Sequence, residues 1–598
     1  MSSSILSARD LEFLLYEWLD VEKLSERPRF AAHSRDTYDA LLELSERLAT
    51  DHFASHYRAG DEHEPQFDGT NITLIPQIGA AIEQFAKADL MALPFDEEVG
   101  GMQVPRTVNA AALAWFSAAN WGTFVYPALT IANVGLLLEH GSAEHIARFV
   151  IPMLKGRFHG TMALSEAHAG SSLADIKTRA IPDSDDTFRI FGSKMWISGG
   201  DHDMGENIVH LVLAKLPGAP AGSKGIYLFI VPKYLVNADG SIGERNDVVI
   251  SGINHKLGSR AAVNTAPVFG DGAFRPGGKA GAVGYLVGEP HRGLACMFHM
   301  MNTMRLSVCI GAAATAYTAY LKSLDYARNR PQGRPLTDSD PTKPQVPITA
   351  HADVRRMLLA QKSYAEGGMA LALYCNRLLD DQNTAPTDAE RAAAGTLLDV
   401  LTPIAKSWPS QWGQVGNDLA IQVLGGAGYT RDYDIEAHWR DQRLNSIHEG
   451  THGIQALDLL GRKVLGTRGA GLMALAGKIG ETTQRATAMG GEAAGFATDL
   501  ADAVERLGTV TMTLAGLGDA DKTMANATTY LEATGHIVVS WLWLEQFLAT
   551  GDKPGDFYEG KRHATRYFFR CELPKVGPML DLLASADTTA LDMRDSWF

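Results

Sequence analysis

The spacing of apolar residues divides the chain into stretches with helical periodicity and a stretch with strand-like alternation. Over residues 10–156 apolar side chains recur at helical spacing, for example at Leu41, Leu44 and Leu48, which predicts amphipathic helices. Over residues 158–274 the pattern changes to alternation in segments rich in aromatic and β-branched residues, such as FRIFGSKMWIS and KGIYLFIVP. No helical period interrupts this second stretch, so it predicts an antiparallel β-domain and not a βαβ alternation.

A helical pattern resumes over residues 293–467 and is broken only at 330–347, where repeated prolines force a loop. The last stretch, 468–598, is again helical, and its clearest apolar face is made by Phe496, Leu500, Val504 and Leu507. We therefore predict an α+β fold. The predicted domains are an N-terminal α-helical domain (1–157), a central antiparallel β-domain (158–275), an α-helical domain like a four-helix bundle (276–467) and an additional C-terminal helical domain (468–598).

The composition excludes some classes of function but does not identify one. Lys plus Arg number 54 and Asp plus Glu 69, and a net charge of −15 argues against nucleic-acid binding, which needs a basic face. The four cysteines are far apart without a CxxC pair, which predicts buried thiols in a reducing compartment. No run approaches the roughly 18 uninterrupted apolar residues of a membrane span, and neither a secretory signal nor a peroxisomal SKL ending is recognisable, so we expect a cytoplasmic location.

One short motif formally matches a zinc site. Residues 448–452 read His-Glu-Gly-Thr-His, the HExxH pattern of zinc hydrolases, in which two histidines one helical turn apart hold the metal and the glutamate is the base. Gly450 and Gly453 disfavour a helix here, and neither Glu nor His follows between His452 and Lys478 to complete the ligand set. We therefore predict no metal, and keep a zinc hydrolase as a remote alternative.

The same segment, LNSIHEGTHGIQALDLLGRK, resembles the active-site stretch of the acyl-CoA dehydrogenase family, usually Tyr-Glu-Gly-Thr-Asn-Gly-Ile-Gln. Four further blocks resemble that family in its order: TMALSEAHAGSSLADIKTRA, SKMWISGG, RLSVCIGAAATAYTAYLKSLDYARNRPQG and IQVLGGAGYTRDYDIEAHWRD. The resemblance covers about residues 93–463. The RDLEFLLYEWLD opening and the terminal helical unit resemble the family's long subgroup, which includes 3-methylthiopropanoyl-CoA dehydrogenases and bacterial fatty acyl-CoA dehydrogenases.

The resemblance implies FAD as cofactor. In the family an indole at the position of Trp196 stacks on the flavin, although a sheet-core role for Trp196 is the ordinary alternative. The GGxG turn at Gly425 follows a helical pattern, so it is not a Rossmann fingerprint. The residues assigned to the cofactor are Met162, Leu164, Ser165, Gly170, Ser171, Trp196, Ile197, Ser198, Arg330, Gln422, Gly425, Gly426, Thr451 and Gly453. In the family this glycine loop and an arginine matching Arg330 receive the adenine end of a flavin bound mainly by a neighbouring subunit, so a homodimer is expected. Here Arg330-Pro-Gln-Gly lacks the family's aromatic residue.

The resemblance also assigns the chemistry. Glu449 is the base that takes the α-proton of an acyl-CoA thioester while hydride leaves the β-carbon for flavin N5, giving trans-2-enoyl-CoA, and an electron-transfer flavoprotein accepts the electrons. The residues assigned to the substrate are Ser171, Arg305, His448 and Gly450. A flavin acyl-CoA oxidase on the same fold is the alternative, and the substrate is expected to be a fatty acyl-CoA or 3-methylthiopropanoyl-CoA.

Several residues allow two interpretations. His448 replaces the family's tyrosine and His452 its asparagine. A histidine beside the base could shift the pKa of Glu449 or contact the thioester, and could change its own charge near neutral pH, or both histidines could be passive substitutions. Arg305 is either a CoA contact or an ordinary helix-surface charge. Four methionines could line an acyl tunnel but more often such a cluster is core; these are Met297, Met300, Met301 and Met304.

Overall fold

The protein consists of two compact units, which are described separately. The computed structural model describes residues 4–183, 187–338 and 340–598. Unit 1 comprises Met1–Tyr38, Pro105–Ala118 and Val308–Phe598, and unit 2 comprises Asp39–Val104 and Ala119–Ser307. Each unit is therefore assembled from segments that are far apart in the sequence.

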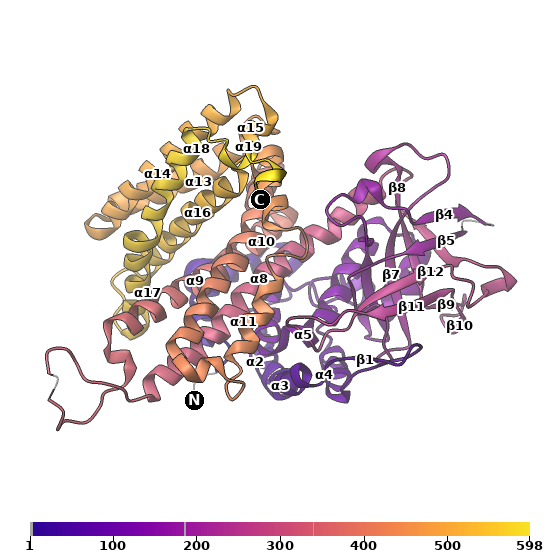
Figure 1. Cartoon of the computed structure of the whole chain (residues 1–598), viewed down its shortest axis with the longest axis horizontal. Helices are drawn as coiled ribbons and strands as arrows, with labels where there is room; N and C mark the ends of the chain where they lie inside the picture. The colour runs from indigo at the N-terminus through magenta and orange to yellow at the C-terminus, as the bar shows by residue number, and fades with distance from the viewer. Residues whose placement is uncertain (1–3, 184–186, 339) are drawn as a thin grey trace. The chain divides into compact units, whose positions relative to one another are not determined.

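The described chain is helical on both sides of a β-rich region (Figure 1). The helices are α1 (Ala8–Glu12), α2 (Arg35–Leu48), α3 (Tyr57–Glu62), α4 (Pro76–Lys87), α5 (Arg106–His140), α6 (Ala143–His145), α7 (Ile151–Leu154), α8 (Gly293–Asn329), α9 (Ala352–Thr384), α10 (Asp388–Leu424), α11 (Ile435–Leu444), α12 (His452–Leu457), α13 (Ala470–Met489), α14 (Gly491–Ala515), α15 (Ala520–Met524), α16 (Ala527–Thr550), α17 (Asp556–Tyr567), α18 (Val576–Ala584) and α19 (Thr589–Asp592). The predicted order of α, β and α regions is confirmed.

The strands of unit 2 form one large sheet and two small pairs. They are β1 (Gln66–Phe67), β2 (Ile72–Thr73), β3 (Phe158–Ala163), β4 (Arg179–Pro182), β5 (Thr187–Ser193), β6 (Ile197–Ser198), β7 (Asn207–Lys215), β8 (Ile226–Pro232), β9 (Tyr234–Val236), β10 (Ile242–Arg245), β11 (Val248–Ile253), β12 (Asn264–Phe269) and β13 (Ala282–Val287). The large sheet has the order β11-β12-β5-β13-β8-β7-β3, with β4 pairing β5 and β7, and β6 pairing β12.

Two features of this sheet correct the sequence prediction. The predicted β-domain ends at residue 275, but β13 lies beyond it and pairs with both β5 and β8 in the interior of the sheet. A glycine-rich stretch before AVGYLV obscured this strand. The sheet is also not wholly antiparallel, because β7 runs parallel to β3 and to β4.

The helix α5 is long and strongly apolar. It is long and apolar enough to cross a membrane by length and composition, although no uninterrupted apolar run marks it in the sequence. Its most apolar window is 89% buried inside the protein, which is the behaviour of a core helix. The apolar run in α16 is likewise buried, as expected from the sequence.

In unit 1, α9 and α10 pack along each other, and α13, α14, α16 and α18 form the C-terminal group (Figure 1). The predicted apolar face of α14 is confirmed, because Phe496, Leu500 and Leu507 are buried. Three of the four cysteines are buried as expected, whereas Cys571 is exposed.

A network of buried charges joins distant segments of unit 1. Lys561 on α17 is fully buried and forms ion pairs with Asp10 on α1 and, at 2.9 Å, with Glu366 on α9. Its ammonium also donates to Gln546 Oε1 of α16 at 2.9 Å, and Asp10 accepts from the Tyr317 hydroxyl at 3.1 Å. Four segments of the chain thus share one buried cation.

Unit 2 contains three buried histidines close to one another. The rings of His159 and His202 meet edge to face with centroids 4.8 Å apart, and His210 Nδ1 lies 2.7 Å from Thr161 Oγ1. Burial lowers the pKa of His159 to about 4 and that of His210 to about 3. It also lowers the pKa of His202 well below its usual value, with further contributions from the charges of His159, Lys233 and His210. All three imidazoles are therefore neutral at neutral pH.

Acid should therefore destabilise unit 2 steeply. Between about pH 4 and the ordinary histidine pKa of 6.5 the unfolded chain binds more protons than the folded one, so the free energy of unfolding falls as the pH falls. Each buried histidine contributes up to about 1.4 kcal/mol per pH unit in this window. His210→Gln should give a shallower pH dependence in urea unfolding curves, whereas His63→Gln at an exposed position should leave it unchanged. Equal slopes for all three proteins would contradict a role of the buried cluster.

Candidate active site

The residues that were predicted to contact a flavin from the β-domain lie on two adjacent segments of unit 2. One segment is the end of β3 and the loop after it; the other is β6 with the residue before it. The two are joined by backbone hydrogen bonding, because the Met195 amide donates to the Ser165 carbonyl at 2.9 Å. The predicted residues on these segments are Met162, Leu164, Ser165, Gly170, Ser171, Trp196, Ile197 and Ser198.

Trp196 leaves the sheet instead of filling its core. The strands β5 and β6 both pair with β12, with Ser193 opposite Val268 and Ile197 opposite Thr265. Three residues, 194–196, therefore oppose two, 266–267, which is the pattern of a β-bulge. Trp196 has a φ of +67°, and the residue is 62% exposed. A left-handed backbone at a bulky residue costs on the order of 1–3 kcal/mol and is frequent at ligand sites. The sheet-core interpretation of Trp196 is wrong.

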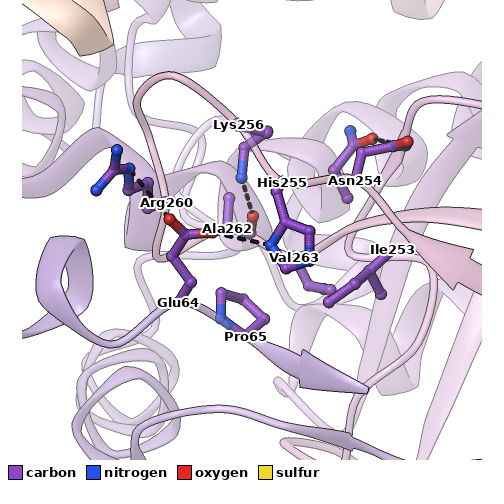
Figure 2. Close-up of a pocket in the computed structure, with 10 residues that line it drawn as sticks. Glu64, Pro65, Ile253, Asn254, His255, Lys256, Arg260, Ala262 and Val263 are labelled. Atoms are coloured by element: carbon purple, nitrogen blue, oxygen red, sulfur yellow. Dashed lines mark hydrogen bonds and ion pairs between the residues drawn. The ribbon is translucent and has the colours of Figure 1, made fainter. Parts of the chain in front are cut away.

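The opposite end of β6 is supported by a small polar pocket (Figure 2). Asn264 donates to Ser198 Oγ at 3.2 Å, and Asn254 donates to Asn264 Oδ1 at 2.7 Å. Glu64 pairs with His255 Nδ1 at 3.1 Å and with Arg260 Nε at 3.3 Å across the pocket. The residues that line it are Glu64, Pro65, Ile253, Asn254, His255, Lys256, Arg260, Ala262, Val263 and Asn264. None of these was predicted as a site residue. Their polar groups largely bond to one another, so these residues stabilise the position of β6.

Arg305 and the neighbouring methionines lie on the part of α8 that belongs to unit 2. Arg305 is 4% exposed, and its Nη1 donates to Asn302 Oδ1 at 3.5 Å, so the helix-surface interpretation is wrong. A buried guanidinium is consistent with a specific role, but its predicted contact with CoA stays a prediction. Met297, Met300 and Met304 are buried, as the core interpretation expects, and their lining of an acyl tunnel stays a prediction.

The glycine loop lies in unit 1 at the end of α10. Gly425 has a φ of +60°, and its amide donates to the carbonyls of the helix's last turn. A Cβ at Gly425 or Gly426 would meet no atom within 4 Å, so the backbone of this turn, next to Gln422, is openly accessible. Arg330 is exposed directly after α8, and its carbonyl accepts from the Ile348 amide at 2.9 Å.

Glu449 lies in a tight turn between α11 and α12. Glu449 has a φ of +54° and Gly450 a φ of +93°, so the chain is not helical here. Gln455 Nε2 donates to the Glu449 carbonyl at 3.0 Å and to the Gly450 carbonyl at 3.4 Å. A Cβ at Gly450 would meet that nitrogen at 2.6 Å, so this close packing requires a glycine. Thr451 is the N-cap of α12. The turn thus presents Glu449 on a backbone that Gln455 fixes.

This turn contradicts the zinc interpretation of the HExxH pattern. A zinc helix needs both histidines on one face of one helix, but α12 begins at His452, and His448 precedes the left-handed turn. Within the described ranges, no group of three or more His, Cys, Asp or Glu side chains is placed to hold a metal ion.

Both histidines beside Glu449 are held neutral. Burial lowers the pKa of His448 to about 3 and that of His452 to about 4, and in each case the positive charge of Lys406 lowers it further. His448 Nε2 lies 3.2 Å from Asn445 Oδ1, and His452 Nδ1 lies 3.1 Å from Ser407 Oγ. The expectation that these imidazoles change charge near neutral pH is therefore wrong.

The burial of three charged residues near the predicted site residues was not predicted from the sequence. Lys406 on α10 is fully buried, and Lys194, two residues before Trp196, forms a buried ion pair with Glu166 at 3.0 Å. The available signal was a lysine within a strand-like segment, two residues before the tryptophan of SKMWISGG, and a lysine within the apolar centre of α10. Neither pattern distinguishes a buried charge from an exposed one without the fold.

Comparisons with known proteins identify the family of this chain. The acyl-CoA dehydrogenase N-terminal domain matches residues 35–157, the acyl-CoA dehydrogenase C-terminal domain matches 291–465, and the acetyl-CoA dehydrogenase C-terminal-like domain matches 475–594. The chain is 35% identical to 3-methylmercaptopropionyl-CoA dehydrogenase of Ruegeria pomeroyi, over 89% of each chain. It is 32% identical to the broad-specificity linear acyl-CoA dehydrogenase FadE5 of Mycobacterium tuberculosis, over 100% of each chain.

Solved structures share the fold at lower sequence identity. An acyl-CoA dehydrogenase of Bacillus anthracis complexed with FAD superposes with a TM-score of 0.74 at 19% identity, covering 98% of this chain and 93% of the other. The similarities define an oxidoreductase with helical, β and helical regions in succession. The chain belongs to the acyl-CoA dehydrogenase family, in a form with an additional C-terminal helical region.

The cofactor of this family is FAD, and the residues present fit it. An exposed indole on a left-handed backbone offers a flat apolar face beside the backbone groups of β6. At Gly425, Gly426 and Gly170 an added Cβ would meet no atom within 4 Å, so a phosphate group has space to approach the backbone closely at these positions.

Proposed function

We propose that this enzyme dehydrogenates an acyl-CoA thioester between its α and β carbons to the trans-2-enoyl-CoA, with Glu449 as the base. The observation that carries this proposal is the turn at Glu449. Its backbone is left-handed, its carbonyl is held by Gln455, and Gly450 after it allows Gln455 to pack against the turn. A carboxylate on such a fixed turn can be positioned toward one carbon of a bound substrate.

The residues of this chain would divide the work as follows. A Glu449 carboxylate oxygen accepts the α-proton, and the Glu449 amide is the proposed donor to the thioester oxygen, where negative charge accumulates. Bound FAD supplies the acceptor of the β-hydride. Trp196 and Ser198 are proposed to hold the flavin ring and its polar edge. Arg330, Gln422 and the 425–426 glycines are proposed to receive the adenine–pyrophosphate end of a flavin bound mainly by a neighbouring subunit.

The neutral histidines suit this role for Glu449. A positive charge on His448, which precedes Glu449 in the chain, would favour the carboxylate and weaken it as a proton acceptor. With the pKa of His448 lowered to about 3, the imidazole carries no charge at neutral pH and can act as a hydrogen-bonding group toward substrate. The basicity of Glu449 is then independent of histidine protonation over the physiological range.

We propose an unbranched acyl chain as the substrate class. One relative is named for 3-methylmercaptopropionyl-CoA and another for linear acyl-CoA, and both acyl groups are straight chains, since the thioether sulfur replaces a methylene. An electron-transfer flavoprotein is the proposed electron acceptor. We also propose a homodimer, since Tyr429 in the glycine turn is 91% exposed and Tyr433 is 43% exposed.

Anaerobic addition of a straight-chain acyl-CoA should bleach the visible absorbance of the bound flavin. The panel contains saturated linear acyl-CoAs of increasing length and 3-methylthiopropanoyl-CoA, and the rate of bleaching ranks the substrates. A branched acyl-CoA of equal carbon number is the matched control and should react more slowly. Rapid peroxide formation in air, without any other acceptor, would favour an oxidase, and no bleaching with any member would contradict the proposal.

A further inference from the structure

The bulge that carries Trp196 is anchored by a buried lysine. Lys194 lies two residues before Trp196 and is 2% exposed. Its ammonium donates to the Leu164 carbonyl at 2.9 Å and to Glu166 Oε1 at 3.0 Å. Its amide donates to the Pro267 carbonyl of β12 at 2.8 Å. Lys194 is therefore bonded both to the sheet and to the loop that follows β3.

Glu166 continues this connection on the loop. Its carboxylate accepts from the amides of Lys177 at 2.7 Å and Thr178 at 3.0 Å, and from the Thr178 hydroxyl at 2.6 Å. Its backbone pairs with that of Ala169 in both directions at 3.0 Å, which closes the turn. Burial alone would raise the pKa of Glu166, but the Lys194 charge and these hydrogen bonds hold that pKa below its usual value. The pair is thus ionised and fully engaged.

This cluster stabilises an otherwise unfavourable backbone. The left-handed φ of Trp196 and the extra residue of the bulge are maintained only if the surrounding structure fixes them. Burying the Lys194 charge is itself costly, and burial lowers its pKa to about 8. Stability alone does not explain a buried ion pair next to an exposed indole, because two apolar side chains of similar size would stabilise the fold at least as well.

We propose that Lys194 is a positioning residue for the flavin. Through the Leu164 carbonyl and the Glu166 carboxylate it holds Trp196 and the 164–171 loop in the single arrangement that receives the isoalloxazine ring. Lys194 itself contacts neither cofactor nor substrate in this role. The inference rests on the proposed flavin-facing role of Trp196, and it is tested without acyl-CoA, so that failure of the proposed reaction and failure of this inference give different results.

The test measures FAD binding to the apoprotein and the absorption and circular dichroism spectra of the bound flavin. Lys194→Met removes the ammonium and keeps the stem, and we expect about tenfold weaker FAD binding or more with a changed flavin spectrum. Lys177→Met is the matched control, because the Lys177 side chain is exposed and only its amide bonds to Glu166. It should bind FAD as the wild type does.

Coupling to Trp196 separates positioning from a general loss of structure. In a double-mutant cycle with Trp196→Phe, the effect of Lys194→Met on FAD binding should shrink markedly, since both changes act on one contact. Additive effects, or wild-type binding and spectrum in Lys194→Met, would overturn the inference. If Lys194→Met does not fold, the double variant E166Q/K194M avoids an unpaired buried charge, and its FAD binding and spectrum decide between the same two outcomes.

Discussion

Glu449→Gln should bind FAD normally and lose reduction of the flavin by acyl-CoA, with a rate lower by about 10²- to 10⁴-fold. The amide has nearly the size of the carboxylate but cannot accept the α-proton. The backbone turn should persist, because Gln455 bonds to the main-chain carbonyl of residue 449 and not to its side chain. The measurement is stopped-flow absorbance of the holoenzyme mixed anaerobically with its best acyl-CoA.

The appropriate comparison is Glu505→Gln, at an exposed position on α14 in the same unit. This control should react at the wild-type rate. A Glu449→Gln enzyme that reduces its flavin as fast as the control would show that another group is the base. An enzyme that has lost FAD as well would place Glu449 in cofactor binding and not in proton transfer.

Lys561→Met should destabilise the protein by about 3–5 kcal/mol. The change removes the buried cation that pairs with Asp10 and Glu366; Glu366 keeps its ion pair with Lys362, whereas the buried Asp10 carboxylate loses its cation. Burial already raises the pKa of Asp10, and the loss of Lys561 raises it further, so the variant binds an extra proton when folded. Its stability should therefore fall as the pH rises, and the deficit measured by urea unfolding should be smaller at pH 5 than at pH 8.

A matched surface pair tests whether burial causes this effect. Lys553 on the turn after α16 pairs with Glu17 at 2.7 Å, but its side chain is 45% exposed. Lys553→Met should cost less than about 1 kcal/mol, because exposed ion pairs contribute little. Equal losses in the two variants would mean that the Lys561 network contributes nothing beyond an ordinary surface contact.

Local sequence patterns predicted most of the elements. The three-and-four spacing of α14, the proline-rich loop before α9 and the alternation of β5 and β8 each depend on neighbouring residues, and each was recognised. The segment around Glu449 was interpreted from its two glycines and its resemblance to a known active site. The left-handed turn explains why those glycines oppose a zinc helix.

Features that depend on distant residues were not predictable. The alternating pattern of FRIFGSKMWIS continues through Trp196. The bulge that turns the indole outward is visible only from the pairing with β12, where two residues oppose three. The low pKa of His448 depends on burial and on Lys406, which lies on another helix. The glycine-rich stretch before β13 obscured that strand, and its place between β5 and β8, which come long before it in the chain, is visible only in the fold.

The buried contact between Asp10 and Lys561 also has a consequence for synthesis. The two residues are at opposite ends of the chain, so during translation Asp10 emerges far ahead of the cation it pairs with. The helices that bury this carboxylate, α8, α9 and α17, cannot close around it until α17 has left the ribosome. Completion of unit 1 is thus a late step of folding, and until then a chaperone can act on its incompletely packed helices.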